Sequence, residues 1–353
     1  MKRTLAILVT SALATLSPAS QAQVSKVRVG FSARTISAGA APFAVATKMG
    51  WFKNDGIEVT VVPLAGSQAT VQNVASKELP FALGDLPALA AARTQGLKAK
   101  IYYSAYQGNI TRLAVPQDSS IRKVSDLKGK TIGVISMGSG VLFAKAAVAS
   151  AGLDSEKDIK VVVAGEGAQT AAMVRSRQVD ALSQFDTQYA MVENAGTKLR
   201  FLDSGEIDHY PGNGMLALEE TLRTRRKEAV ALARGYAKGT IFAISNPEAA
   251  VRILYEVFPQ ARPTGKDEAT AIRDDIKVLE ARIANWRLEN AGVKRWGESS
   301  DARCAQYLDF LRKWGVIKEK LSVQDVVTNE LIDEINNFDS NSVVAEAKVY
   351  RFK

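Results

Sequence analysis

The sequence of 353 residues contains one cysteine, Cys304, and one histidine, His209. A single thiol cannot form a disulfide within the chain, and no His, Cys or carboxylate positions have the spacing of a metal site. We therefore expect no metal and no cofactor. Cys304 lies in a stretch with helical character, Ala302 to Trp314. A lone cysteine in such a stretch is more typical of a small core residue than of a nucleophile.

Long hydrophobic runs are also scarce. The apolar stretch from Leu5 to Leu16 follows Lys2 and Arg3 and precedes the small residues of Ser20-Gln21-Ala22. This order is typical of a secretory signal peptide, and the run is too short to be a comfortable membrane span. We predict a signal peptide over residues 1–22, export to the periplasm, and no membrane or lipid anchor in the mature chain.

The chain is basic, with a formal net charge of +9, but its basic residues are scattered. Only Arg223 to Lys227 form a dense cluster. Basic residues do not alternate with aromatic ones as they do in nucleic-acid-binding surfaces. We expect no nucleic-acid partner, and an anionic small molecule is one explanation for the excess charge.

An imperfect internal copy indicates two similar lobes. Gly66-Ser67-Gln68-Ala69-Thr70 leads to Ala82-Leu83, and Gly167-Ala168-Gln169-Thr170 leads to Ala181-Leu182. Each copy combines a β-rich run, a glycine-containing turn, an amphipathic helix and a second β-rich run. Two αβ units can share this pattern through composition alone, but order and periodicity agree as well as the letters do. A cleft between two such lobes is the expected ligand site.

Strand-like and helix-like segments alternate from Val27 to Tyr210, which is typical of a mainly parallel sheet with crossover helices. After Glu219 the pattern is mostly helical. We predict one helix over Ala41 to Phe52, and another from Ser67 to Glu78 with Ser67 as its N-cap. The predicted lobes are 23–109 with 213–353, which includes a helical C-terminal extension, and 110–212. The chain would cross between them near Asn109 and Asn213.

The sharpest local signal is the turn Ser136-Met137-Gly138-Ser139-Gly140 between a predicted strand and a predicted helix. Free backbone N–H groups at a helix N-terminus favour an anion. The turn lacks the Gly-Lys-Ser/Thr of a P-loop and the glycine spacing of a dinucleotide site. A plain β–α turn in which Ser139 caps the helix is the alternative.

Other predicted strand ends should meet this turn, because ligands bind outside the C-terminal ends of parallel strands. Arg34 could pair with a carboxylate or sulfonate, or could be an exposed loop residue. Tyr106 and Phe185 could hold a ring, one from each lobe, or pack in the core. The candidate ligand residues are Ser32, Arg34, Thr35, Ser67, Gln68, Gly84, Asp85, Tyr106, Gln107, Ser136, Met137, Gly138, Ser139, Gln184, Phe185, Asp186, His209 and Asn213.

His209 follows Asp208 near the second predicted crossing. A His–carboxylate pair can support acid–base chemistry, but no arrangement of a Ser or Cys nucleophile accompanies it. We expect a hinge or cleft-rim residue, no catalytic residues, and no enzymatic activity.

Several motifs carry a family resemblance. They include Ala46-Thr47-Lys48-Met49-Gly50-Trp51-Phe52-Lys53-Asn54-Asp55-Gly56, Phe81-Ala82-Leu83-Gly84-Asp85-Leu86-Pro87 and Val124-Ser125-Asp126-Leu127-Lys128-Gly129-Lys130-Thr131. Between about Val27 and Leu218 the chain resembles solute-binding proteins of the sulfonate/nitrate/taurine type, the periplasmic receptors of ABC importers, which are related to thiamine-pyrimidine synthases. The resemblance implies a type II periplasmic-binding-protein fold of class α/β, with a mixed, mainly parallel sheet flanked by helices in each lobe.

The same resemblance implies that the lobes close on a small ligand and deliver it to an inner-membrane permease with its ATPase. The active-site histidine and the Cys-rich segment of the synthase branch have no counterpart here. The sequence therefore favours a monomeric, exported binding subunit for a small organic anion, such as a sulfonate or an aromatic carboxylate. The alternatives are an enzyme of the same fold acting on a ring compound, with His209 and Asp186 or Glu166 as its acid–base pair, and a ligand-sensing periplasmic subunit.

Overall fold

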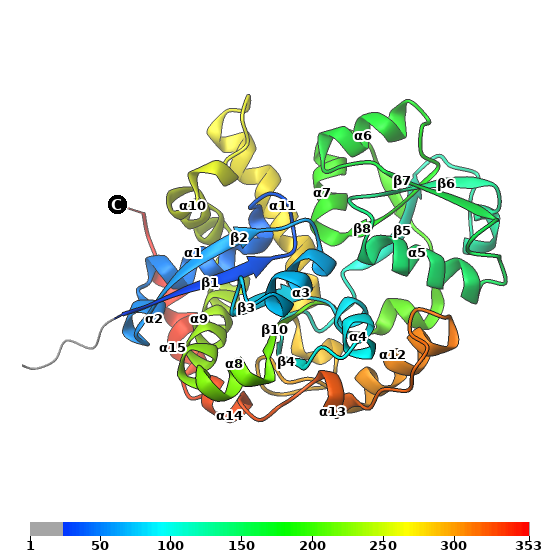
Figure 1. Cartoon of the computed structure of the whole chain (residues 1–353). Helices are drawn as coiled ribbons and strands as arrows, with labels where there is room; N and C mark the ends of the chain where they lie inside the picture. The colour runs from blue at the N-terminus through cyan, green and yellow to red at the C-terminus, as the bar shows by residue number, and fades with distance from the viewer. Residues whose placement is uncertain (1–23, 353) are drawn as a thin grey trace, which may run out of the picture.

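The structure is a computed structural model that describes residues 24–352. The predicted signal peptide, 1–22, lies outside these residues. The chain forms two α/β lobes side by side, each built on a five-stranded sheet, and the later helices pack mainly around the first lobe (Figure 1). The predicted fold class is confirmed.

The first sheet has the strand order β2-β1-β3-β10-β4. Strand β1 pairs in parallel with β2 and β3, whereas β10 runs antiparallel to β3 and β4. The return of the chain near Met215 therefore supplies a strand inside this sheet. The strands are β1 (Ser25–Phe31), β2 (Ile57–Pro63), β3 (Phe81–Gly84), β4 (Ala99–Ser104) and β10 (Gly214–Leu218).

The second sheet repeats this arrangement with the order β7-β6-β8-β5-β9. Strand β6 is parallel to β7 and β8, and β5 is the antiparallel strand between β8 and β9. Each sheet thus has one antiparallel strand that directly adjoins a crossing between the lobes. The strands are β5 (Thr111–Pro116), β6 (Lys130–Val134), β7 (Ile159–Val163), β8 (Ala181–Phe185) and β9 (Leu199–Phe201).

The internal copy in the sequence corresponds to a copy in the structure. The unit β2-α3-β3, with α3 at Ser67–Ala75, matches β7-α6-β8, with α6 at Ala168–Arg175. Two residues after each helix ends lie Lys77 and Arg177, which are the non-glycine residues with positive φ in the described chain, at 63° and 56°. A conformation that costs energy for an L-residue thus recurs at the same place in both lobes.

Two local predictions were wrong. The predicted helix from Ala41 to Phe52 is divided into α1 (Ala41–Lys48) and α2 (Trp51–Asn54), because Gly50 has a left-handed φ of 72°. Ser67 is the first residue of α3 and not its N-cap; the cap position is Gly66, with φ 86°.

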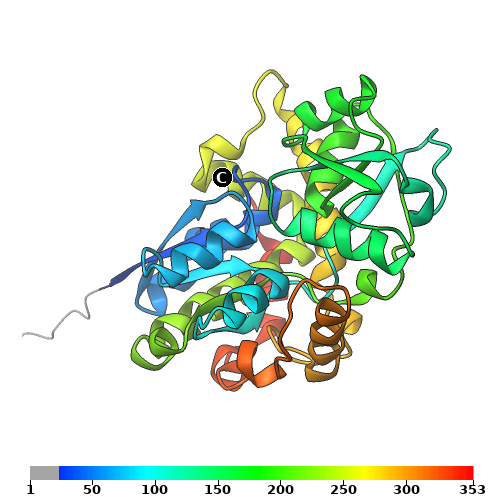
Figure 2. The same ribbon diagram turned by 45° about the vertical axis from the view of Figure 1, so that its right-hand side comes forward.

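The helices after β10 cover the first lobe and then reach the second. Helix α9 packs on α1, and α10 packs on both α1 and α11. Helix α11 also packs on α7 of the second lobe, so it links the two lobes (Figures 1 and 2). The remaining helices are α4 (Leu86–Thr94), α5 (Ser139–Ser150), α7 (Asp186–Asn194), α8 (Glu219–Thr224), α9 (Arg226–Ser245), α10 (Pro247–Val257), α11 (Glu268–Trp286), α12 (Asp301–Lys313), α13 (Val323–Val326), α14 (Ile332–Ile335) and α15 (Ser340–Val349).

The two chain segments that cross between the lobes are hydrogen-bonded to each other at the hinge. The N–H of Gly212 donates to the carbonyl of Tyr106 at 3.0 Å, and the N–H of Tyr106 donates to the carbonyl of Asn213 at 3.0 Å. The side-chain amide of Asn109 donates to the carbonyl of Ile207 at 2.7 Å. These bonds satisfy the backbone where the chain leaves both sheets.

Cys304 is buried in α12, and burial raises the pKa of its thiol to about 12. A protonated, buried thiol is a weak nucleophile, as expected for a core residue. Among residues 24–352, none of the helices has the length and apolar character required to cross a membrane.

Candidate functional site

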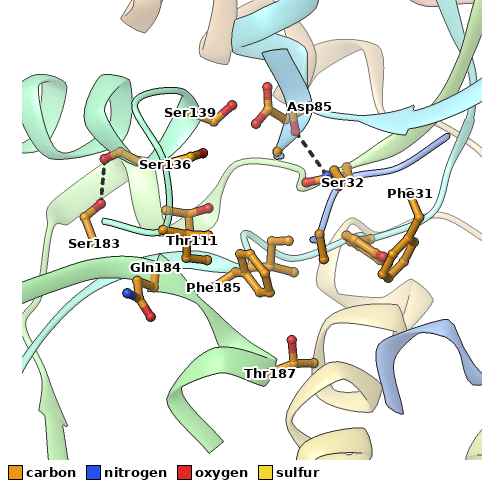
Figure 3. A pocket seen from close by; sticks show the side chains of 18 of the residues that line it. Phe31, Ser32, Asp85, Thr111, Ser136, Ser139, Ser183, Gln184, Phe185 and Thr187 are labelled. Carbon is orange, nitrogen blue, oxygen red and sulfur yellow. Dashed lines mark hydrogen bonds between the residues drawn. The ribbon is translucent and has the colours of Figure 1, made fainter. Parts of the chain in front are cut away.

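A cavity lies between the lobes, where strand ends of both sheets meet (Figure 3). The first lobe contributes the ends of β1, β3 and β4, and the second contributes β8 and the start of α5. Helix α11 adds one residue. The lining residues are Phe31, Ser32, Ala33, Ser37, Gly66, Ser67, Asp85, Tyr106, Ile110, Thr111, Ile135, Ser136, Ser139, Gly140, Ser183, Gln184, Phe185, Thr187, Asn213 and Arg282.

Hydroxyl and amide groups make up most of the polar lining. The side-chain amide of Asn213 donates to the hydroxyl oxygen of Ser32 at 2.9 Å and of Ser67 at 3.3 Å, which orients both serines. On the opposite side, the hydroxyl of Ser183 donates to the carbonyl of Gly140 at 2.7 Å and fixes the start of α5 against β8. Such groups bind polar atoms of a ligand without requiring a charge on it.

Asp85 is the acidic residue of the lining. It caps α4, and its carboxylate accepts a hydrogen bond from the N–H of Ala88 at 2.9 Å. Burial raises the pKa of this carboxyl, although hydrogen bonds from Ser139, Ala88 and Ser67 act in the opposite direction. No Lys, Arg or His of the described chain forms a salt bridge with it. A carboxyl that is hydrogen-bonded but has no cationic partner therefore faces the cavity.

Arg282 is the basic residue of the lining, but its charge is already paired. Its Nε and Nη2 atoms donate to the carboxylate of Asp186 at 2.7 to 3.0 Å, and the amide of Asn285 donates to the same carboxylate at 2.9 Å. The two paired side chains are 4% and 10% exposed. Burial alone would lower the pKa of Arg282, but the nearby Asp186 carboxylate raises it above its usual value. Arg282 therefore keeps its positive charge, and the carboxylate of Asp186 balances that charge.

Aromatic rings close other sides of the cavity. The guanidinium carbon of Arg282 lies 4.1 Å from the ring centroid of Tyr106 and 5.9 Å from that of Phe185, both cation–π distances. Tyr106 is almost fully buried, and Arg282 covers one face of its ring. Its ring is therefore less accessible to a ligand than its position after the end of β4 suggested. Phe185 is only partly buried and offers the more open ring (Figure 3).

The turn before α5 reaches the cavity, but not through the expected glycine. The N–H of Gly138 donates to the carbonyl of Ser136 at 2.9 Å and is not free. The next two N–H groups, of Ser139 and Gly140, precede the first internal bond of α5, and both residues line the cavity. Any anion-like atom, such as a carbonyl oxygen, would therefore meet these two donors.

The structure brings half of the sequence-predicted residues together in this cavity. They come from both lobes and from the second crossing. The predicted residues that line it are Ser32, Ser67, Asp85, Tyr106, Ser136, Ser139, Gln184, Phe185 and Asn213.

Arg34 and Thr35 lie at the rim instead. Both are exposed, and the hydroxyl of Thr35 and the N–H of Arg34 donate to the carboxylate of Glu166, at 2.9 and 3.3 Å. Because Glu166 belongs to the second lobe, these bonds join the lobes across the mouth of the cleft. Arg34 does not supply a cation to the cavity.

The other predicted residues lie elsewhere. Gln68, Met137 and Gly138 line a separate surface depression beside α4. Gly84 is packed within β3, Gln107 bonds to the carbonyl of Glu298 at 3.0 Å, and Asp186 binds Arg282. His209 is exposed on a wide groove on the hinge side of the molecule, away from the ligand cavity.

Sequence reasoning missed several lining residues. Phe31, Ser183 and Thr187 directly adjoin predicted positions, so extending each predicted loop by a residue or two would have included them. Arg282 had no such signal, because it lies within a long helix almost a hundred residues after Asp186. Among residues 24–352, no group of three His, Cys, Asp or Glu side chains is placed to hold a metal.

The model of the NMT1/THI5-like family matches residues 37–250, which is more than half of the chain. The chain belongs to the NMT1/THI5-like family. This confirms the family resemblance expected from the motifs around Phe81 and Val124.

Two relatives of this chain are named after the solutes that they bind. The riboflavin-binding protein RibY of Chloroflexus aurantiacus is 24% identical over 296 residues, covering 83% of this chain and 82% of the relative. The formylaminopyrimidine-binding protein of Halalkalibacterium halodurans is 22% identical over 263 residues, covering 73% and 76%.

The fold of this NMT1/THI5-like protein is also found in solved structures. The alkanesulfonate-binding protein SsuA of Xanthomonas axonopodis pv. citri, bound to MOPS, has a TM-score of 0.65 and 16% identity, over 87% of this chain and 99% of that one. At this identity the likeness establishes the shared fold and says nothing about the ligand.

Proposed function

We propose that this protein is the exported, monomeric solute-binding subunit of an ABC importer. It captures a small ring-containing solute without net negative charge between its lobes and delivers it to a membrane permease. The observation that carries the ligand class is the charge of the cavity: Asp85 has no cationic partner, whereas the charge of Arg282 is balanced by Asp186.

This proposal revises the anionic ligand expected from the sequence. A sulfonate or carboxylate would lie near Asp85 with no free Lys or Arg among the lining residues, and the cost of burying that unpaired charge would oppose binding. Net positive charge elsewhere on the chain does not change this, because a Debye length is about 8 Å at physiological ionic strength. The names of two relatives, for riboflavin and a formylaminopyrimidine, agree with an uncharged ring compound.

Binding rather than turnover is supported by the functional groups of the cavity. The hydroxyl of Ser183 donates to a carbonyl, those of Ser32 and Ser67 accept from the amide of Asn213, and neither His209 nor Cys304 lies in the lining. The hydroxyls of Ser67 and Ser139 lie beside the Asp85 carboxyl, but no His, Lys or Cys of residues 24–352 lines the cavity to complete an activated nucleophile with them. The acid–base pair that sequence reasoning offered for an enzyme is not assembled either. Asp186 is held by Arg282, Glu166 bonds to Arg34 and Thr35 at the rim, and His209 faces the hinge groove.

A charge-sorted binding screen tests the proposal. Ring compounds that are cationic, neutral, carboxylated or sulfonated would be compared by thermal shift, since a ligand that binds only the folded state raises the apparent stability. We expect shifts from the cationic and neutral classes, confirmed by titration calorimetry with one site per chain. Tightest binding of sulfonates or carboxylates would overturn the ligand class, and chemical conversion of a ligand during incubation would overturn the binding role.

A further inference from the structure

We infer that Asp85 and Phe185 select a nitrogen-rich ring: a flat compound whose amino, amidine or protonated ring-nitrogen edge binds the Asp85 carboxylate while the ring lies on Phe185. This inference rests on the proposed function and names the ligand chemistry of the same cavity.

The two residues occupy equivalent positions in the internal copy. Asp85 follows β3 and is the N-cap of α4; Phe185 ends β8 and occupies the cap position before α7. The two lobes therefore present the same structural position to one cavity from opposite sides, once as a carboxyl and once as an aromatic ring (Figure 3). A ligand that satisfies both must combine hydrogen-bond donors at one edge with an apolar face.

The surroundings of Asp85 make a donor-bearing ligand the best match. One carboxylate oxygen accepts from the N–H of Ala88, and the other polar groups beside the carboxyl are the uncharged hydroxyls of Ser67 and Ser139. A hydrogen bond that an N–H group donates to an ionised carboxylate is about twice as strong as one between two neutral groups. A protonated ligand nitrogen also balances the charge of the carboxylate. A carbonyl at the same ligand position would place two acceptors against each other.

Phe185 completes the recognition from the second lobe. It is partly buried, and the guanidinium of Arg282 lies 5.9 Å from its ring centroid. Aromatic pairs prefer offset or tilted stacking with centroids about 4.5–7 Å apart. The backbone N–H groups of the neighbouring Ser139 and Gly140 can donate to a ring nitrogen or a carbonyl oxygen of the same ligand.

The test uses pairs of compounds that differ only in the group facing Asp85. Benzamidine, benzamide and benzoate share one ring and differ in donors and charge, and 4-aminopyrimidine is paired with 4-pyrimidinone. Dissociation constants would be measured by titration calorimetry for the whole mature protein, for Asp85→Asn and for Asp118→Asn. Asparagine is a good helix N-cap, so the first change retains the cap of α4. Asp118 is exposed and outside the cavity, so its change controls for net charge.

We expect the amino or amidine member of each pair to bind about tenfold tighter or more than its oxo partner. Asp85→Asn should remove that preference, and Asp118→Asn should retain it. As a second variant, Phe185→Leu should weaken both members of a pair together by a few fold, because it removes the ring but not the acceptor.

Equal binding of both members, or an unchanged preference in a folded Asp85→Asn protein, overturns the inference. If only benzoate or ring sulfonates bind, the inference fails while solute binding stands. If no compound of this set or of the broader charge-sorted screen binds, the proposed function fails with it.

Discussion

The guanidinium of Arg282, near the end of α11, is held by the carboxylate of Asp186, at the start of α7 in the other lobe. The pair is almost fully buried, and the carboxylate is further bonded by Asn285. It joins the C-terminal helices to the second lobe directly behind the ligand cavity. The helical extension therefore positions the lobes relative to each other, in addition to covering the first lobe.

Removing one partner of this pair should be costly. Asp186→Asn leaves a buried guanidinium without its counter-charge, and breaking a buried pair in this way destabilises proteins by about 3–5 kcal/mol. Urea unfolding followed by circular dichroism would measure the loss. As a matched control, Lys77→Met breaks the exposed pair of Lys77 with Glu220, where less than about 1 kcal/mol is expected.

Equal stabilities of the two variants would contradict a structural role for the Arg282 pair. The double change of Arg282→Met with Asp186→Leu separates charge from packing. It should recover most of the stability, since an apolar pair leaves no charge unpaired.

Asp85 should reduce the stability of the ligand-free protein at neutral pH. Its folded pKa is raised, so the folded state binds a proton more readily than the unfolded chain does. The destabilisation is therefore present above the folded pKa and disappears as the pH falls through it. Asp85→Asn should raise the ligand-free melting temperature at pH 7 by about 2 °C, and the difference should shrink toward pH 4.

Differential scanning calorimetry of both proteins between pH 4 and 8 measures this effect. The same variant should bind its ligand more weakly, so stability and affinity should change in opposite directions. A lower melting temperature at pH 7 would contradict the assignment and indicate that the carboxylate stabilises α4 more than its burial costs.

The sequence predicted the architecture well because the lobes repeat. The hydrophobic pattern of each β–α–β unit is local, and strands and helices do alternate between Val27 and Tyr210, as the sequence predicts. The misassigned helix end near Gly50 shows the limit of periodicity. Apolar spacing continues through that residue, and only its positive φ divides the helix.

The sequence predicted where the site lies, but it did not predict the charge of the cavity. Residues at strand ends, such as Asp85 and Phe185, could be found because parallel strands place their ends together. The charge of the cavity depends on Arg282 and Asp186, which meet only through the packing of α11 on α7. No local pattern reports such a contact, so the sequence offered only Arg34 as a candidate cation, with an exposed loop position as the alternative that the structure shows.

The hinge should be intolerant of a side chain at Gly212. A Cβ atom there would lie 2.8 Å from the carbonyl oxygen of Gly108 and 2.9 Å from the Cβ of Tyr106. Because the first contact is with a backbone atom, the clash can be relieved only if the two crossing segments move apart. We expect Gly212→Ala to cost about 1–3 kcal/mol in unfolding free energy, as overpacking does, whereas Gly138→Ala, with its nearest contact at 3.8 Å, should cost less. An equal cost in chemical denaturation would show that the crossings are not tightly packed in solution.

The rim contact should control how long a ligand stays bound. Glu166 accepts bonds from Thr35 and Arg34 of the opposite lobe, and it does not line the cavity. Loss of a contact between the lobes should favour opening, which raises the dissociation rate more than it lowers the association rate. Glu166→Ala should therefore increase the dissociation rate of a bound ligand by about three- to tenfold, since the two bonds are partly solvent-exposed and each contributes about 0.5–1.5 kcal/mol.

Stopped-flow displacement measures the dissociation rate of the ligand from Glu166→Ala. Small-angle scattering of the liganded variant should show a larger radius of gyration than that of the wild type at subsaturating ligand. Thr35→Ser retains the hydroxyl donor and serves as the matched control. An unchanged dissociation rate in Glu166→Ala would mean that the rim bonds do not hold the lobes closed and that the pair of Arg282 with Asp186 does so alone.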